Sequence, residues 1–233
     1  MTLRLLRTPL ICSVLAMAAT PLSAADISQS PVLSPSAAPA PKWTLGIEGS
    51  PEIYAIDNGA NQAGELNNIY YKVSLSRRFE SGFVGGVSFQ HAFKDDDKTQ
   101  FYADATLGYK FDVTERFSLR PGVGVGYTWK DTGITKGSDS NADIAYYALT
   151  LGGDLKLERG WTWNMFDLRY RNGFDATWLT PKVATGVTYQ FDSFDAVYLS
   201  VGYAWKKTDT ESPPYNKLSG DKINFALGYK RSF

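Results

Sequence analysis

The chain has 233 residues and a balanced charge, because its 24 Lys and Arg offset its 24 Asp and Glu. This length allows one domain of ordinary size, or a small domain with extensions. The sequence contains one histidine and one cysteine, Cys12. Cys12 lies in a segment that we expect to be cleaved, so the mature chain would contain no cysteine. That composition excludes a disulfide framework, a thiolate metal site and cysteine catalysis.

Residues 1–25 have the features of a secretory signal peptide. Arg4 and Arg7 form a basic start, residues 9–19 are apolar, and small residues over 22–26 offer a cleavage site. The apolar stretch is too short to span a bilayer, because a spanning helix needs about 20 residues. We therefore expect this segment to be removed.

The next segment, 26–41, is rich in Pro, Ser and Ala, which predicts a linker without regular structure. Residues 42–233 show no helical spacing and no apolar run of about 18 residues. Instead, apolar and polar residues alternate, as in 67–79, which is typical of strands with one apolar face. We predict ten strands, with eight or twelve as alternatives, over 42–56, 67–79, 83–93, 100–111, 117–130, 144–158, 161–171, 178–191, 196–206 and 222–233.

The connections between these strands alternate in length. Short turns at 80–82, 112–116, 158–160 and 192–195 alternate with mostly longer, polar segments. This alternation predicts an antiparallel up-and-down meander with all the short turns at one end. An even number of strands then places both ends of the domain at that same end.

Aromatic residues gather at the predicted strand ends. Phe79 and Phe83 flank one short turn, and Phe111 and Phe117 flank the next. The rings near the long loops are Phe93, Phe101, Trp129, Tyr147, Trp178 and Trp205. Two aromatic girdles around a band of Val, Leu, Ala and Gly are typical of a membrane barrel, whereas a soluble barrel points its apolar face inward. The pattern predicts an all-β, transmembrane, antiparallel up-and-down β-barrel.

The chain resembles the bacterial outer-membrane β-barrel (porin-like) superfamily in its alternating strands, its short turns and its last strand. In that family the last strand resembles a signal for the barrel-assembly machinery, and Phe225, Leu227, Tyr229 and Phe233 match its alternation. Arg231 departs from the family pattern, which usually has an apolar residue or tyrosine there. The resemblance implies a bacterial outer-membrane location and contacts with outer-membrane lipid and lipopolysaccharide. It indicates no particular member and no oligomeric state.

The polar face of the predicted strands would line the lumen, and it carries twelve basic and six acidic residues. The candidate lumen-lining residues are Glu48, Lys72, Asp104, Arg120, Asp154, Asp167, Arg169 and Lys182. The basic excess predicts an anion-preferring pore. A salt-bridge network that fills the lumen is the alternative, since eight-stranded barrels are filled by side chains while sixteen-stranded ones leave a channel. Inward glycines, among them Gly126 and Gly228, would widen the bore.

Catalytic chemistry has little support in the sequence. His91 lies on the outward face between Phe89 and Phe93. Outer-membrane phospholipases place a Ser two residues from such a His, but position 93 is Phe, and omptin proteases would need an inward His. The acidic loop at 94–98 lacks the ligand spacing of a calcium loop. We therefore predict no catalytic residue, no metal, no cofactor and no nucleic-acid partner.

Taken together, these patterns predict a small porin-like channel with a basic, weakly anion-preferring lumen. The alternative is a plugged structural or surface-interaction barrel that works through its extracellular loops. An outer-membrane hydrolase is a third possibility. The sequence identifies neither a solute nor a surface partner.

Overall fold

A computed structural model describes residues 43–55, 62–94, 98–134, 136, 139, 141–175, 179–205 and 221–233. The expected signal peptide and linker, Trp178 and most of the acidic loop at 94–98 lie outside the described residues. Every regular element in the described ranges is a β-strand. No helix in those ranges is long and apolar enough to cross a membrane.

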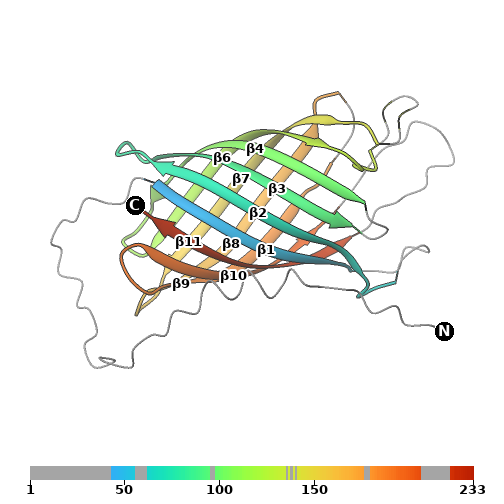
Figure 1. Cartoon of the computed structure of the whole chain (residues 1–233). Coiled ribbons are helices and arrows are strands. Elements are labelled where there is room, and N and C mark those ends of the chain that lie inside the picture. The colour runs from blue at the N-terminus through green and yellow to red at the C-terminus, as the bar shows by residue number, and fades with distance from the viewer. Residues whose placement is uncertain are drawn as a thin grey trace. The chain divides into compact units, whose positions relative to one another are not determined.

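The strands follow one another along the chain with short connections and long connections in turn. In chain order, from blue to red in Figure 1, they are β1 (Trp43–Tyr54), β2 (Leu66–Arg78), β3 (Phe83–Lys94), β4 (Thr99–Tyr109), β5 (Phe111–Asp112), β6 (Phe117–Trp129), β7 (Ile144–Lys156), β8 (Trp161–Gly173), β9 (Lys182–Gln190), β10 (Asp195–Ala204) and β11 (Lys222–Ser232). Apart from β5, each strand has 9 to 13 residues, which is close to the 9–11 that a tilted membrane strand requires.

The sheet closes on itself through antiparallel pairing. β1 pairs with both β2 and β11, and β4 pairs with β6. Figure 1 shows β1 lying beside β11, where the first and last strands meet. β5 continues the line of β4, and both pair with β6. The eleven strands therefore occupy ten positions around the wall, which confirms the predicted ten-stranded up-and-down barrel.

Two strand boundaries differ from the sequence prediction. Lys110 falls between β4 and β5, although its N–H bonds to the carbonyl of Gly82 (2.9 Å) and so continues the β3–β4 register past Phe83 and Tyr109. β9 begins at Lys182 and not at residue 178, because Pro181 has no N–H for the ladder. The carbonyl of Pro181 instead accepts the N–H of Trp205 (2.9 Å).

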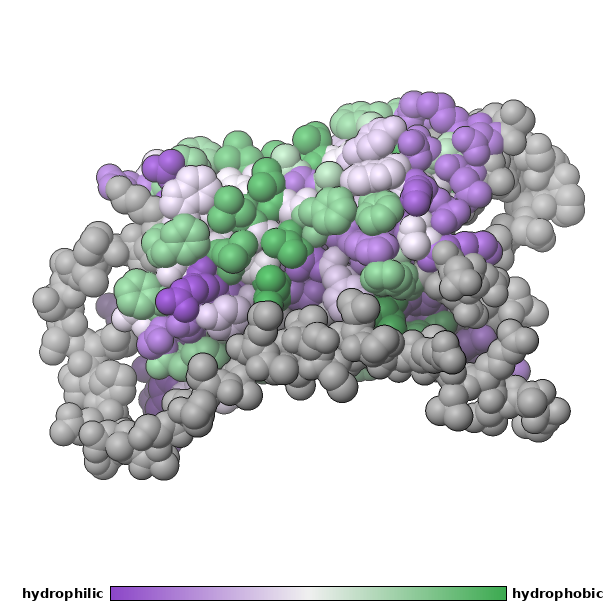
Figure 2. Space-filling model, in the orientation of Figure 1, coloured by the Kyte–Doolittle hydropathy of each residue, from purple (hydrophilic) through white to green (hydrophobic). Residues whose placement is uncertain are grey.

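The wall has an apolar outer face and a polar inner face. Val123, Leu149 and Leu227, all near mid-strand, are 54%, 52% and 59% exposed on the outside. Figure 2 shows apolar side chains along the middle of the visible wall, with hydrophilic side chains gathered toward the long-loop end. Inward positions carry polar residues such as Ser50 and Asn224, which are buried. The barrel is therefore inverted relative to a soluble protein, with its apolar surface outside.

A buried cluster of apolar and aromatic side chains lies inside the barrel, near the long loops. It consists of Ala92, Tyr102, Ile134, Ile144 and Tyr146. Four of these belong to β3, β4 and β7, while Ile134 comes from the β6–β7 loop. The loop doubles back on itself, with the Ala142 N–H bonded to the Ile134 carbonyl (2.9 Å). One side of the lumen is thus filled by apolar and aromatic side chains.

Candidate functional site in the barrel lumen

A cavity of about 560 Å³ occupies the half of the lumen nearer the long loops. Its wall comes from β1, β2, β3, β4, β8, β9, β10 and β11, together with residues of the long loops. The basic side chains on its lining are Lys72, Lys98, Arg169, Arg171, Lys182 and Lys222. The acidic ones are Glu48, Glu52 and Asp131. The lining therefore carries twice as many basic groups as acidic groups.

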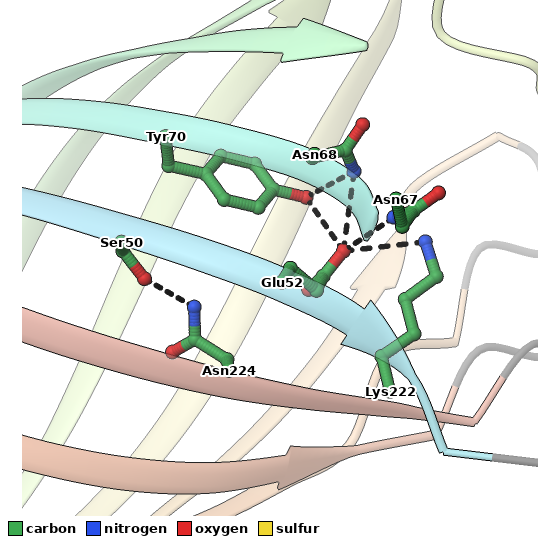
Figure 3. Close-up of polar contacts among 7 residues, drawn as sticks. All are labelled: Ser50, Glu52, Asn67, Asn68, Tyr70, Lys222 and Asn224. Atoms are coloured by element: carbon green, nitrogen blue, oxygen red, sulfur yellow. Dashed lines mark hydrogen bonds and ion pairs between the residues drawn. The ribbon is translucent and has the colours of Figure 1, made fainter. Parts of the chain in front are cut away.

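Glu52 is the centre of a buried polar network at the long-loop end of β1. Figure 3 shows its Oε1 surrounded by donors from β2 and β11. Oε1 lies 2.7 Å from Asn67 Nδ2, 3.1 Å from Asn68 Nδ2, 3.1 Å from the Tyr70 hydroxyl and 3.3 Å from Lys222 Nζ. Three neutral donors and one cation satisfy this carboxylate, as a buried charge requires. Glu52 and Lys222 thus offset each other, and neither contributes to the basic excess.

The basic excess is concentrated where β8 meets β9. Arg169 and Lys182 are directly opposite each other in the strand register, so two positive charges face each other across the ladder. Lys182 Nζ donates to Asn224 Oδ1 (2.8 Å), and Asn224 donates to Ser50, the second pair drawn in Figure 3. Arg169 Nε is buried without a hydrogen-bond partner among the described residues. Like charges directly opposite each other destabilise a sheet, so an anion between them would relieve the repulsion.

Arg171 adds a third cation to the same wall. Its Nε donates to Thr180 Oγ1 (2.8 Å). Its guanidinium lies 5.0 Å from the ring centre of Tyr146 and 5.5 Å from that of Tyr102. These distances allow cation–π attraction, which fixes the side chain against the aromatic side of the lumen.

Tyr198 on β10 lies along the inner wall, over Gly228 on β11 and toward Glu48 on β1. Its hydroxyl donates to Glu48 Oε2 (2.5 Å), and Lys230 Nζ lies 4.4 Å from its ring centre. The ring lies against the backbone of Gly228, where a Cβ atom would overlap it. The Tyr146 ring lies in the same way against Gly126. The sequence suggested that these glycines widen the bore. The structure shows that they instead make room for large side chains that lie flat on the wall.

The predicted lumen residues fall into two groups. Glu48, Lys72, Arg169 and Lys182 line the cavity, while Asp104, Arg120, Asp154 and Asp167 do not. For the four residues outside the cavity, the lumen-lining role stays a prediction. No ion pair links the three candidates Asp167, Arg169 and Lys182 in the described part of the chain, and Asp167 is opposite Ala184 and Gly152 in the strand register.

The residues outside the cavity have partners of their own. Arg120 Nη1 lies 3.8 Å from Asp154 Oδ2, and Asn164 Nδ2 donates to Asp154 Oδ1 (2.8 Å). Asp104 Oδ1 accepts the Tyr146 hydroxyl at 2.5 Å. Both acids are thus held in fixed side-chain networks, which fits the filled-lumen alternative more closely than an open bore.

The aromatic side of the lumen was not predicted from the sequence. The run from Ile144 to Leu151 has apolar residues at both odd and even positions. That double-sided pattern was the available signal that β7 faces an apolar neighbour on its inner side. The insertion of Ile134 had no comparable signal, because it depends on the path of a loop.

His91 lies on the outer face and stacks between two rings. Its ring centre is 3.9 Å from that of Phe93 and 4.4 Å from that of Phe101. His91 Nε2 is buried without a hydrogen-bond partner in the described ranges. The same ranges contain no group of three His, Cys, Asp or Glu side chains that would hold a metal ion. The surroundings of His91 are those of a packed ring.

The candidate assembly residues lie along the outer face of β11. Phe225 and Leu227 are exposed there, and the Tyr229 hydroxyl donates to Asp195. Phe233 exchanges two backbone hydrogen bonds with Trp43, at 2.9 and 3.0 Å. The last residue therefore completes the seam between β11 and β1.

Comparisons with known proteins give no close relative. No family model and no curated protein matches the sequence. Among solved structures, the chain is similar to the KdgM porin at 14% identity, over 81% of this chain and 99% of that one, with a TM-score of 0.40. It is also similar to the NanC porin (10%, 81% and 100%, TM-score 0.46) and to Neisserial surface protein A (12%, 82% and 97%, TM-score 0.39).

These similarities are distant, so the strand pairing within the chain is what defines its class. The closed, ten-position antiparallel wall with an apolar exterior makes the chain an up-and-down β-barrel with an outward apolar face. The resemblance expected from the sequence is confirmed at the level of the fold. No particular member of the superfamily is indicated.

Proposed function

We propose that the chain is an outer-membrane β-barrel whose lumen forms a narrow channel with a weak preference for anions. The observation that carries the proposal is the cavity with six basic and three acidic side chains on its lining.

The exterior supports the membrane location. Each Å² of apolar surface removed from water lowers the free energy of the folded protein by about 25 cal/mol. A long row of exposed Val and Leu would therefore destabilise the barrel in water. Lipid removes that cost. The aromatic residues Trp43, Phe79, Phe83, Phe111 and Phe233 lie at the short-turn end of the outer face, where the membrane interface favours rings.

The lumen supports the anion preference. Glu52 is matched by Lys222. The basic residues that remain on the lining are Lys72, Lys98, Arg169, Arg171 and Lys182, and the remaining acids are Glu48 and Asp131. Inside a low-dielectric wall, such charges attract counter-ions more strongly than they would in bulk water. An anion that enters from the long-loop end therefore meets a basic surface at mid-barrel.

Neutralising the opposed cations tests this proposal. In a planar bilayer with a KCl gradient, the reversal potential should show chloride preferred over potassium. We expect Arg169→Gln with Lys182→Gln to move that potential toward zero. Arg116→Gln, at an exposed site in a short turn, is the matched control and should change nothing. Unchanged selectivity in the double variant would contradict the assignment.

A plugged surface-interaction barrel is the second candidate, and one observation favours it. The Ile134 cluster fills one side of the lumen, and the Tyr198 ring and Glu48 add side chains along the wall. This candidate predicts no current, together with loss of function when the long loops are removed.

In either case we expect no catalytic activity, and His91→Phe should leave lipid composition unchanged. Outer-membrane lipid, lipopolysaccharide and the barrel-assembly machinery remain the proposed partners.

A further inference from the structure

Two arginines interrupt the apolar outer face at the short-turn end of the barrel. Arg77 on β2 is opposite Trp43 on β1, and Arg231 on β11 is opposite Leu45 on β1. β1 therefore runs between them. We call Arg77, Arg231 and the adjacent rings of Trp43 and Phe79 the arginine rim.

Arg77 lies among rings and lacks a counter-charge. Its guanidinium carbon is 5.3 Å from the ring centre of Trp43 and 5.2 Å from that of Phe79. Its Nε is buried without a hydrogen-bond partner, and no ion pair to Arg77 occurs among the described residues. Arginine stays protonated in proteins. A permanent charge on a lipid-facing surface is expensive unless an anion accompanies it.

Arg231 is only partly neutralised. Its Nη1 lies 3.8 Å from Asp195 Oδ1, and the same oxygen accepts the Tyr229 hydroxyl. The Arg231 side chain is 61% exposed, so its remaining N–H groups are accessible to a ligand. Asp195 is thus shared between two donors on β11. Arg231 retains hydrogen-bonding capacity toward an external anion.

We propose that the arginine rim binds the phosphate of an anionic phospholipid headgroup at the short-turn end of the barrel. This inference rests on the proposed membrane location. A guanidinium matches phosphate through parallel N–H···O bonds. The girdle rings mark the level at which headgroups begin. Arg77 and β11 are separated by two interstrand spacings, about 10 Å, so the two arginines can contact one headgroup or adjacent headgroups.

Native mass spectrometry of the full refolded barrel in detergent tests the proposal. The probes are phosphatidylglycerol, phosphatidylcholine and inorganic phosphate. We expect phosphatidylglycerol to bind more tightly than phosphatidylcholine. Arg77→Gln should weaken phosphatidylglycerol binding about fivefold, the factor that corresponds to ~1 kcal/mol per basic side chain near a membrane surface. Arg231→Gln should have a smaller effect because Asp195 already holds part of that charge.

Arg78→Gln is the matched control, because the adjacent residue in β2 points toward the lumen. It should leave lipid binding unchanged, and Arg77→Lys should retain most of the preference. The heat-dependent gel shift of folded barrels confirms that each variant is folded. Equal affinity for the two lipids, or equal loss in Arg78→Gln, would overturn the proposal. Displacement of the lipid by millimolar inorganic phosphate would also overturn it, since the site would then be specific for free phosphate.

The two proposals can fail separately. If the membrane location is wrong, the unmodified chain will not insert into vesicles. If only the lipid site is wrong, an inserted and conducting barrel will show no preference for phosphatidylglycerol.

Discussion

Glycines on the inner wall decide where the large lumen side chains lie. Tyr198 lies flat against Gly228, and from that position its hydroxyl reaches Glu48 at 2.5 Å. An aromatic ring that covers a glycine in the neighbouring strand is a recurrent way to stabilise a curved sheet. The position of the Tyr198 ring on the wall therefore depends on the absence of one Cβ atom.

Gly228→Ala should displace the Tyr198 ring and break its hydrogen bond to Glu48. Overpacking of this kind lowers the free energy of unfolding by about 1–3 kcal/mol. We therefore expect a lower urea midpoint. Gly49→Ala is the control, because a Cβ there meets no atom within 4 Å. If steric overlap with the ring is the cause, Gly228→Ala should cost much less in a Tyr198→Ala background. An equal cost in both backgrounds would refute this explanation.

At the scale of elements, the β6–β7 loop narrows the lumen. It places Ile134, which is 1% exposed, against Ile144, Tyr146 and Tyr102 on the inner wall. The loop also contacts the segment after β8 through the ion pair between Lys136 and Asp175. An apolar anchor and an exposed ion pair therefore hold the same loop in place.

Ile134→Ala should loosen this anchor and enlarge the lumen. Truncating a buried Ile to Ala typically costs 2–5 kcal/mol, so we expect a lower urea midpoint and a larger single-channel conductance. Ile47→Ala removes an equal side chain from the outer face, where it is 43% exposed, and serves as the control. A conductance that stays unchanged in Ile134→Ala would show that the loop does not limit the current.

The ion pair should make the loop contact sensitive to acid. The hydrogen bond from Lys136 holds the pKa of Asp175 below its ordinary value of about 3.9. A lowered pKa in the folded state means that the contribution is fully present above about pH 4 and is lost as the pH falls through the lowered value. The pair is exposed, so its contribution should be under ~1 kcal/mol.

Comparison of the unmodified chain with Asp175→Asn measures this contribution. The small difference between their urea midpoints at pH 6 should disappear near pH 2. A difference that persists in acid would mean that Asp175 acts through something other than its charge.

At the scale of the whole molecule, the fold was accessible from sequence because each strand carries its own alternation. The odd positions of 67–79 predicted the outer face, and β2 indeed exposes Tyr71 and Val73 there. The lumen was harder to predict. Glu48 and Tyr198 are 150 residues apart in the sequence. Their contact depends on the strand register with which β11 pairs with β1 to close the barrel. The path of the loop that carries Ile134 follows no periodic pattern.

The seam itself gives a prediction for the entire barrel. Phe233 contributes both backbone hydrogen bonds to Trp43 and a ring at the outer surface. Its deletion should therefore leave unfolded protein in the periplasm, while Phe233→Tyr should be tolerated. Heat-modifiable mobility on gels reports the folded fraction. A normal folded barrel after the deletion would contradict the role of Phe233 in closure and assembly.

The most direct test of the account is the single-channel conductance of the unmodified barrel in a planar bilayer under a KCl gradient. A water-filled but obstructed lumen with a basic lining predicts small, discrete current steps and a reversal potential that favours chloride. The absence of any current would contradict the channel and support the plugged barrel. A large, cation-selective current would contradict both the narrowing of the lumen by the Ile134 cluster and the basic character of the lumen.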